Sequence, residues 1–186
     1  MAIRAGTEEK LLDAADELFF SKGIAATPID AVLERAGVSA ATLYRGYASK
    51  EALVAAALDR RQREWLRIWD DAIAARNTAA GRLLAIFDAL EIFREQPMGS
   101  RWCAFLGSAA EYADPPAELA RAIRDDTETM RARLVQLATA VDPRRSDELG
   151  EQLLLVVTGD LAMRLRSPAH PTGVARSIAA ALIAYR

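Results

Sequence analysis

Hydrophobic residues recur along this chain at the spacing of amphipathic helices. Leucines and alanines three and four positions apart predict a first helix from Thr7 to about residue 22, which Gly23 ends. Thr27 is the expected N-cap of a short second helix, and Gly37 ends that helix. Ser39 and Ser49 are then the expected N-caps of a third helix (40 to about 47) and a long fourth one.

The rest of the chain predicts longer helices. Apolar stripes of helical period recur between turns, most of which contain proline. The stripes cover residues 83–90, 102–109, 123–141, 149–165 and 174–185. The alternation of a β-strand appears nowhere. The pattern therefore predicts an all-α protein of about nine helices.

Composition narrows the function classes. The 186 residues are 52% hydrophobic and 27% charged, which is typical of a globular chain. A single cysteine and a single histidine exclude an internal disulfide and a Cys/His metal cage, and the residues indicate no cofactor. The histidine, His170, lies in a predicted loop without a catalytic motif, so an enzyme is disfavoured. Cys103 is expected to be a small packed residue, with redox sensing as the alternative.

The termini and apolar runs predict a location. The first residues lack the apolar core of a signal peptide. The longest apolar run, residues 178–185, is too short to cross a bilayer, which needs about 20 residues. We therefore expect a soluble, cytoplasmic protein with no membrane partner.

The second and third predicted helices have the layout of a helix-turn-helix. Gly37 supplies the tight turn, while Val38 and Leu43 are expected to face the first helix. The exposed face of the third helix is then small and polar, which suits the major groove of DNA. It comprises Ser39, Ala40, Ala41, Thr42, Tyr44 and Arg45.

The charge distribution supports the same interpretation. The whole chain has a formal charge of -2, yet the segment from Arg35 to Lys50 holds three basic residues and no acidic one. A basic patch on an acidic chain is the electrostatic footprint of phosphate binding. We expect the arginines between Arg60 and Arg67 to form a solvated helix face instead.

Residues 7 to about 58 resemble the DNA-binding domain of the TetR-type (tetracycline-repressor-like) transcriptional regulators. The matching pieces are residues 11–15, 18–19, 22–23, 27, 35–39, 42–44 and 47–53. The resemblance implies a helix-turn-helix domain over residues 1–58 and a helical ligand-binding and dimerisation domain over residues 59–186. It also implies a homodimer that binds a palindromic operator and leaves it when a small, largely apolar effector fills a C-terminal pocket.

The resemblance also implies roles for individual residues at the DNA. Those that approach the bases would be Ala40, Ala41 and Thr42, with Arg45 on the same face. Those that hold phosphates would be Thr27, Ser39, Tyr44, Tyr47 and Lys50.

A pocket and a dimer interface are expected in the C-terminal part. The candidate pocket residues are Phe87, Asp88, Trp102, Phe105, Leu106, Glu111, Met130 and Thr158. The apolar ones could equally be plain core, and the two acids could be solvated or could bind a cationic or hydroxylated ligand. The last two helices carry more apolar surface than one bundle hides, which predicts a dimer interface. Its candidate residues are Leu154, Leu161, Val174, Ile178 and Leu182.

Two hypotheses of function are left open. The first is a ligand-responsive transcriptional regulator, most simply a repressor. The alternative is a helical protein-interaction module without sequence-specific DNA binding, which would not require the acid-free segment from Arg35 to Lys50.

Overall fold

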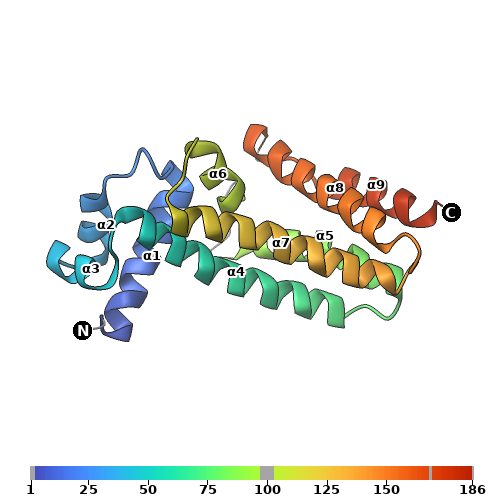
Figure 1. Ribbon diagram of the computed structural model, residues 1–186, viewed down its shortest axis with the longest axis horizontal. Coiled ribbons are helices and arrows are strands. Elements are labelled where there is room, and N and C mark those ends of the chain that lie inside the picture. Colours follow the sequence, from blue (N-terminus) through green and yellow to red (C-terminus); the bar gives the residue numbers. More distant parts are fainter. Residues whose placement is uncertain (1–2, 97–102, 168, 186) are drawn as a thin grey trace. The chain divides into compact units, whose positions relative to one another are not determined.

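The computed structural model describes residues 3–96, 103–167 and 169–185. In these residues the chain forms nine α-helices and no strand, which confirms the predicted all-α class (Figure 1). The helices are α1 (Ala5–Lys22), α2 (Ile29–Ala36), α3 (Ala40–Gly46), α4 (Lys50–Ala74), α5 (Ala79–Glu95), α6 (Ala104–Glu111), α7 (Ala117–Thr139), α8 (Ser146–Arg166) and α9 (Gly173–Ala184). None of the helices in these ranges is long and apolar enough to cross a membrane.

The chain divides into two compact units. Unit 1 comprises Met1–Gln62 and Ala104–Arg124, and unit 2 comprises Arg63–Cys103 and Asp125–Arg186. Helices α4 and α7 contribute residues to both units, and α6 belongs to unit 1. The expected domain boundary between residues 58 and 59 stays a prediction.

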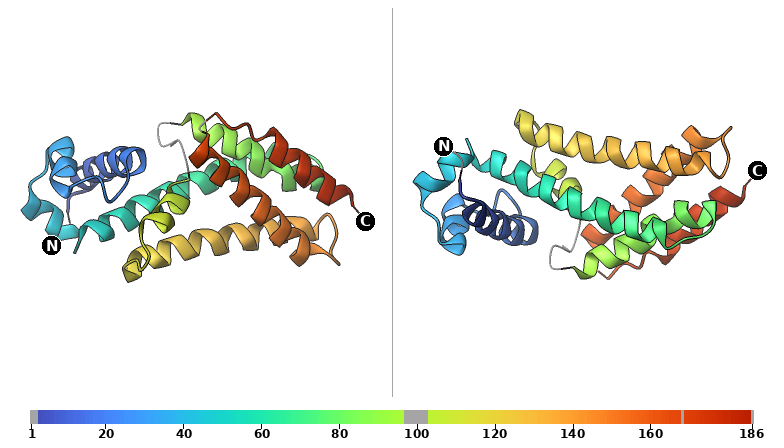
Figure 2. Two further views of the ribbon diagram at one scale, coloured as in Figure 1. Left: turned by 90° about the horizontal axis from the view of Figure 1, so that it is seen from above. Right: turned by 90° about the horizontal axis from the view of Figure 1, so that it is seen from below.

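Unit 1 is built around its first three helices. Helix α1 packs against α2, and α2 against α3, as Figure 2 shows at the blue end of the chain. Leu11, Val32, Leu43 and Leu53 contribute one fully buried side chain from each of α1 to α4. Burying four such side chains contributes about 1.5–3 kcal/mol each and fixes the face that α3 leaves outward.

Unit 2 is a larger helical core. Trp69 on α4, Leu83 and Phe87 on α5 and Leu134 on α7 are completely or almost completely buried in it. Helix α9 runs alongside α8 and α5, and both views of Figure 2 show these helices next to one another. Helix α9 faces this core mainly through Ala175 and Ala179, while Val174 and Ile178 of its predicted stripe are exposed.

Two helix starts differ from the sequence prediction. Helix α1 begins at Ala5 and not at Thr7, and the cap position of α2 is taken by Pro28, with no capping side chain. Thr27 does not cap α2 because its hydroxyl is turned inward, where it donates to the Gly23 carbonyl over 2.7 Å. The predicted N-caps Ser39 and Ser49 are confirmed, since their hydroxyls accept the backbone N–H groups of Thr42 and Ala52.

A buried polar cluster lies where α8 turns into α9. The Asp160 carboxylate accepts a hydrogen bond of 2.8 Å from Arg164, and both side chains are almost fully buried. Thr172 accepts from Arg164 and donates to Glu91 of α5. His170 lies with its Nε2 atom 3.6 Å from Asp160, and its side chain is only 20% exposed, so it packs against this cluster.

Candidate nucleic-acid interface

The turn between α2 and α3 is held by backbone geometry that glycine makes possible. Gly37 has φ 64° and ψ 38°, the left-handed conformation that closes many helices. Its N–H group donates to the Glu34 carbonyl over 3.2 Å, and the next N–H group, of Val38, donates to the Leu33 carbonyl over 3.0 Å. These bonds use the last carbonyls of α2 and direct the chain into α3.

Helix α3 is anchored from one side only. Leu43 is its single buried residue, with no exposed surface. Ser39 caps the helix: its hydroxyl accepts the Thr42 N–H over 3.3 Å and lies 2.9 Å from the Thr42 hydroxyl. The exposed residues of the predicted interface are Ser39, Ala40, Ala41, Tyr44 and Arg45. The α3 part of the predicted site is therefore one continuous outward surface. At its N-terminal end the side chains are small, so a partner can approach the helix closely there.

The basic residues near α3 differ in whether their charged groups already have a partner within the chain. Arg45 is exposed, and no carboxylate in the described part of the chain pairs with it. Arg35 forms an ion pair of 2.7 Å with Glu17, and both side chains are more than half exposed. Lys50 donates to the Ile24 carbonyl over 2.5 Å and lies 5.6 Å from the ring centre of Phe19. The positive charge that α3 offers to a phosphate is therefore mainly that of Arg45.

Two other predicted phosphate ligands point inward. Thr27 is 2% exposed, with its hydroxyl bonded to the Gly23 and Leu18 carbonyls. Tyr47 is buried, and its hydroxyl donates to Glu8 over 3.1 Å. Burial, together with that bond, raises the pKa of Tyr47 to about 12. Their phosphate contacts stay predictions, and each would require the hydroxyl to exchange an internal partner for DNA.

The first arginines of the segment from 60 to 67 are not a solvated face. Arg61 binds both carboxylate oxygens of Asp16 over 2.9 and 3.0 Å, and its side chain is 4% exposed. Burial raises the pKa of Asp16, and the charge of Arg61 opposes that rise. Arg60 pairs with Asp13 over 2.7 Å. Sequence patterning missed this attachment of α4 to α1, because residues about 45 positions apart share no periodicity.

The predicted pocket residues fall into three groups. Phe105, Leu106 and Glu111 lie on α6 in unit 1, whereas four others lie in unit 2 and Trp102 lies outside the described residues. The four in unit 2 are Phe87, Asp88, Met130 and Thr158. Their role as an effector site stays a prediction.

The residues of these groups have distinct surroundings. Phe87 and Met130 are buried in the core of unit 2, and Thr158 is exposed on α8. Asp88 is held by Arg76 and Arg176, each at 2.7 Å. Glu111 binds backbone N–H groups of the turn that follows α1. Both acids thus have partners within the chain.

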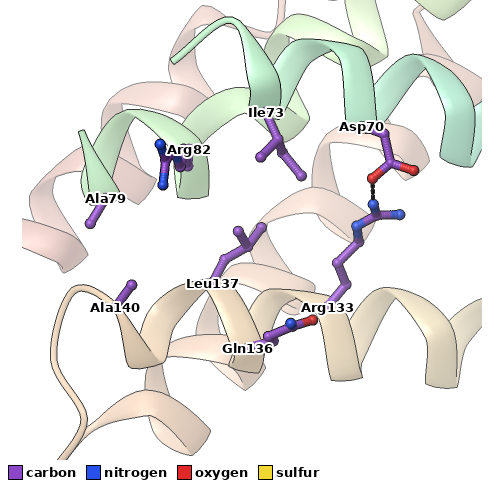
Figure 3. Close-up of a pocket in the computed structure, with 8 residues that line it drawn as sticks. All are labelled: Asp70, Ile73, Ala79, Arg82, Arg133, Gln136, Leu137 and Ala140. Carbon is purple, nitrogen blue, oxygen red and sulfur yellow. Dashed lines mark ion pairs between the residues drawn. The ribbon is translucent and has the colours of Figure 1, made fainter. Parts of the chain in front are cut away.

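A cavity of about 280 Å³ opens in unit 2 between α4, α5 and α7 (Figure 3). Ile73 and Leu137 point toward one another across it, and Arg133 pairs with Asp70 at one end. Its lining residues are Asp70, Ile73, Ala79, Arg82, Arg133, Gln136, Leu137 and Ala140. No predicted pocket residue lies among them, and sequence periodicity gave no signal for this cavity.

The predicted dimer residues divide by exposure. Leu154 is buried in the core of unit 2, and Leu161 and Leu182 are half-buried against it. Val174 and Ile178 are exposed on α9. On α8 the exposed leucines are Leu155, which is 74% exposed, and Leu165, which is 41% exposed.

The comparisons with known proteins agree with this arrangement. The pattern of the family described as bacterial regulatory proteins, tetR family, matches residues 11–57, which span α2, the turn and α3. An uncharacterized HTH-type transcriptional regulator of Mycobacterium tuberculosis is 36% identical over 95 residues, or 50% of this chain. The matched region spans 47%, about half, of that curated relative's length.

Solved structures extend the likeness along the whole chain. A TetR-family transcriptional regulator from Streptomyces coelicolor superposes with a TM-score of 0.82 at 26% identity, over 96% of this chain and 87% of the other. A TetR transcriptional regulator from Chloroflexus aurantiacus superposes with a TM-score of 0.79 at 23% identity, over 97% and 95% of the two chains. The second likeness is one of fold.

Proposed function

We propose that this chain, which belongs to the TetR family of helix-turn-helix transcriptional regulators, is a ligand-responsive repressor that binds a palindromic operator as a homodimer. The observation that carries the proposal is the outward face of α3. Leu43 fixes the helix from below, while Ala40, Ala41, Tyr44 and Arg45 remain exposed. An anchored helix with an open, small-residue N-terminal end is the part that enters a major groove.

The side chains on this face suggest how DNA is read. Alanine offers a base edge only an apolar contact, of which the thymine methyl group is the natural partner. Arg45 can donate to a base edge or to a phosphate, and the hydroxyls of Ser39 and Tyr44 can donate to phosphates. We expect affinity to depend on the charge of Arg45, with Ala40 and Ala41 admitting the helix to the groove.

A homodimer is supported by the outer faces of α8 and α9. Val174 and Ile178 lie on one side of α9, four residues apart, and both are about half exposed or more. On α8, Leu155 is exposed, and a Cβ atom built on Gly159 would meet no atom within 4 Å. Two copies of this pair of helices would form a four-helix interface with a twofold axis.

Release by an effector is proposed for unit 2. Helix α4 supplies residues to both units. A ligand that displaces α4 within unit 2 would therefore also displace the part of α4 that belongs to unit 1. DNA would select the dimer form whose two α3 helices lie about 34–36 Å apart, and an effector would select another form. In this proposal the protein acts in the cytoplasm.

Selection of DNA from a random duplex library tests the proposal. We expect the wild-type chain to enrich an inverted repeat, and its affinity to fall steeply with added salt. Arg45→Ala should lower the affinity about tenfold and make the salt dependence shallower. Arg63→Ala is the matched control, because Arg63 is exposed on α4 and has no carboxylate partner in the described ranges. Failure to enrich any duplex at low salt would favour the interaction module instead.

A further inference from the structure

The turn after α1 receives a carboxylate from a distant helix. Glu111, the last residue of α6, accepts the N–H of Ile24 at one carboxylate oxygen over 3.0 Å and the N–H of Ala25 at the other over 2.7 Å. All three residues belong to unit 1. Two successive N–H groups that point the same way form an anion-binding nest, and here the chain fills that nest itself.

The position of Glu111 argues for a role outside its own helix. A negative charge at the C-terminal end of a helix meets the negative end of the helix dipole, which is unfavourable. The two charge-assisted hydrogen bonds to the turn offset this cost, because such bonds are stronger than neutral ones. Gly23 favours the arrangement through its backbone, since its φ of 96° is a conformation that residues with a side chain rarely adopt.

Lys50 binds the same turn at the carbonyl group of Ile24. Its ammonium group donates to the Ile24 carbonyl over 2.5 Å, so a carboxylate binds the N–H of Ile24 and an ammonium binds its C=O. The chain enters α2 only five residues after Ile24, and α2 leads through Gly37 into α3. The two charges thus fix the point from which the helix-turn-helix begins.

We propose that Glu111 and Lys50 are positioning residues for DNA binding, which together hold the turn of residues 23–27 and so set the orientation of α2 and α3. The inference rests on the proposed function. In this proposal α6 helps to position the DNA-binding helices. Lys50 binds the backbone of the turn and does not contact a phosphate.

Glu111→Gln tests this with little change of shape. The amide can accept only one of the two N–H groups, so hydrogen exchange of the Ile24 and Ala25 amides should quicken about tenfold or more. Affinity for the selected duplex should fall about tenfold at an unchanged salt slope. Asp114→Asn removes the same charge three residues away, at an exposed position, and should change neither quantity.

Lys50→Met separates positioning from phosphate binding. Methionine keeps an apolar stem beside Phe19 and removes the charge. If Lys50 is a positioning residue, Lys50→Met should bind DNA more weakly with the wild-type salt slope. The variant that combines Lys50→Met with Glu111→Gln should lose no more affinity than the product of the two single losses. A salt slope reduced by about one would assign Lys50 to a phosphate and overturn its part in the inference.

Glu111→Gly provides a second readout, which a loss of folding cannot imitate. Added acetate can occupy the empty nest, so acetate should restore part of the DNA affinity relative to chloride at equal ionic strength. If acetate restores no affinity, or if Glu111→Gln binds DNA as tightly as the wild-type chain, this inference is overturned while the proposed function still stands. Absence of any DNA binding by the wild-type chain overturns the proposed function, and the inference with it.

Discussion

Unit 1 buries Asp16 together with its counter-charge, whereas unit 2 buries Asp126 with no cation bound to it in the described ranges. In both cases burial raises the pKa of the carboxyl group. Only for Asp16 do neighbouring charges oppose the rise, chiefly that of Arg61 and to a smaller extent that of Arg60. A buried aspartate therefore attaches α4 to α1 in unit 1, through the ion pair of Asp16 with Arg61. In unit 2 the buried Asp126 has no such ion pair in the described ranges.

The outer surfaces of the units differ as well. In unit 1, α3 turns alanines, a tyrosine and an arginine outward, and its one leucine is buried. In unit 2, α9 buries alanines and turns Val174 and Ile178 outward. A polar outer face suits a solvated or charged partner, and an apolar one suits a second protein surface. Under the proposed function, DNA would bind the first surface and a copy of the chain the second.

Removing Arg61 should have the largest effect on stability. Arg61→Met leaves Asp16 buried without its partner, which costs about 3–5 kcal/mol of the free energy of unfolding. Arg60→Met is the matched control, because its partner Asp13 is 66% exposed and such a pair contributes about 1 kcal/mol or less. Urea unfolding measures both. Equal losses in the two variants would mean that unit 1 does not depend on its buried pair.

A charge on the outer face of α9 should have the next largest effect. Ile178→Glu would place a carboxylate in the proposed interface, and we expect a monomer in sedimentation velocity. Because a monomer contacts one half-site only, its operator affinity should fall about 100-fold, or about 2.7 kcal/mol. Ala180→Glu, exposed on another side of α9, should leave a dimer. A dimeric Ile178→Glu would place the interface elsewhere.

The sequence was sufficient where structure is decided locally. The turn at Gly37 and the caps at Ser39 and Ser49 depend on residues within four positions of each other, and all three were predicted correctly. The pairs Asp16–Arg61 and Ile24–Glu111 join residues 45 and 87 positions apart. Only the fold brings such residues together, so no local pattern announces them.

Helix α8 shows a second limit of the sequence. Its residues 149–165 are apolar nearly all round, and a pattern without a polar face does not say which side is buried. Leu154 was predicted at the interface but lies in the core of unit 2, 8% exposed, while its neighbour Leu155 is exposed. Whether either one contacts a second chain stays a prediction.

The buried carboxyl group of Asp126 predicts the last and smallest effect, a pH dependence of stability. Burial raises its pKa from 3.8 to about 7. Between these values the folded chain holds a proton that the unfolded chain has lost, so the free energy of unfolding falls as the pH rises through about 7. From pH 5 to pH 8 the loss from this group should be about 2–3 kcal/mol.

Asp126→Asn should remove that loss, because an amide cannot ionise. Urea unfolding at pH 5 and pH 8 would then show a smaller difference than in the wild-type chain, with the variant more stable at pH 8. Asp125→Asn changes the neighbouring, exposed aspartate and should keep the wild-type difference. If both variants keep it, Asp126 is ionised in the folded chain at neutral pH, which requires a cation or water beside it. The contrast with Asp16 would then be one of partner type, since both carboxylates would be charged and compensated.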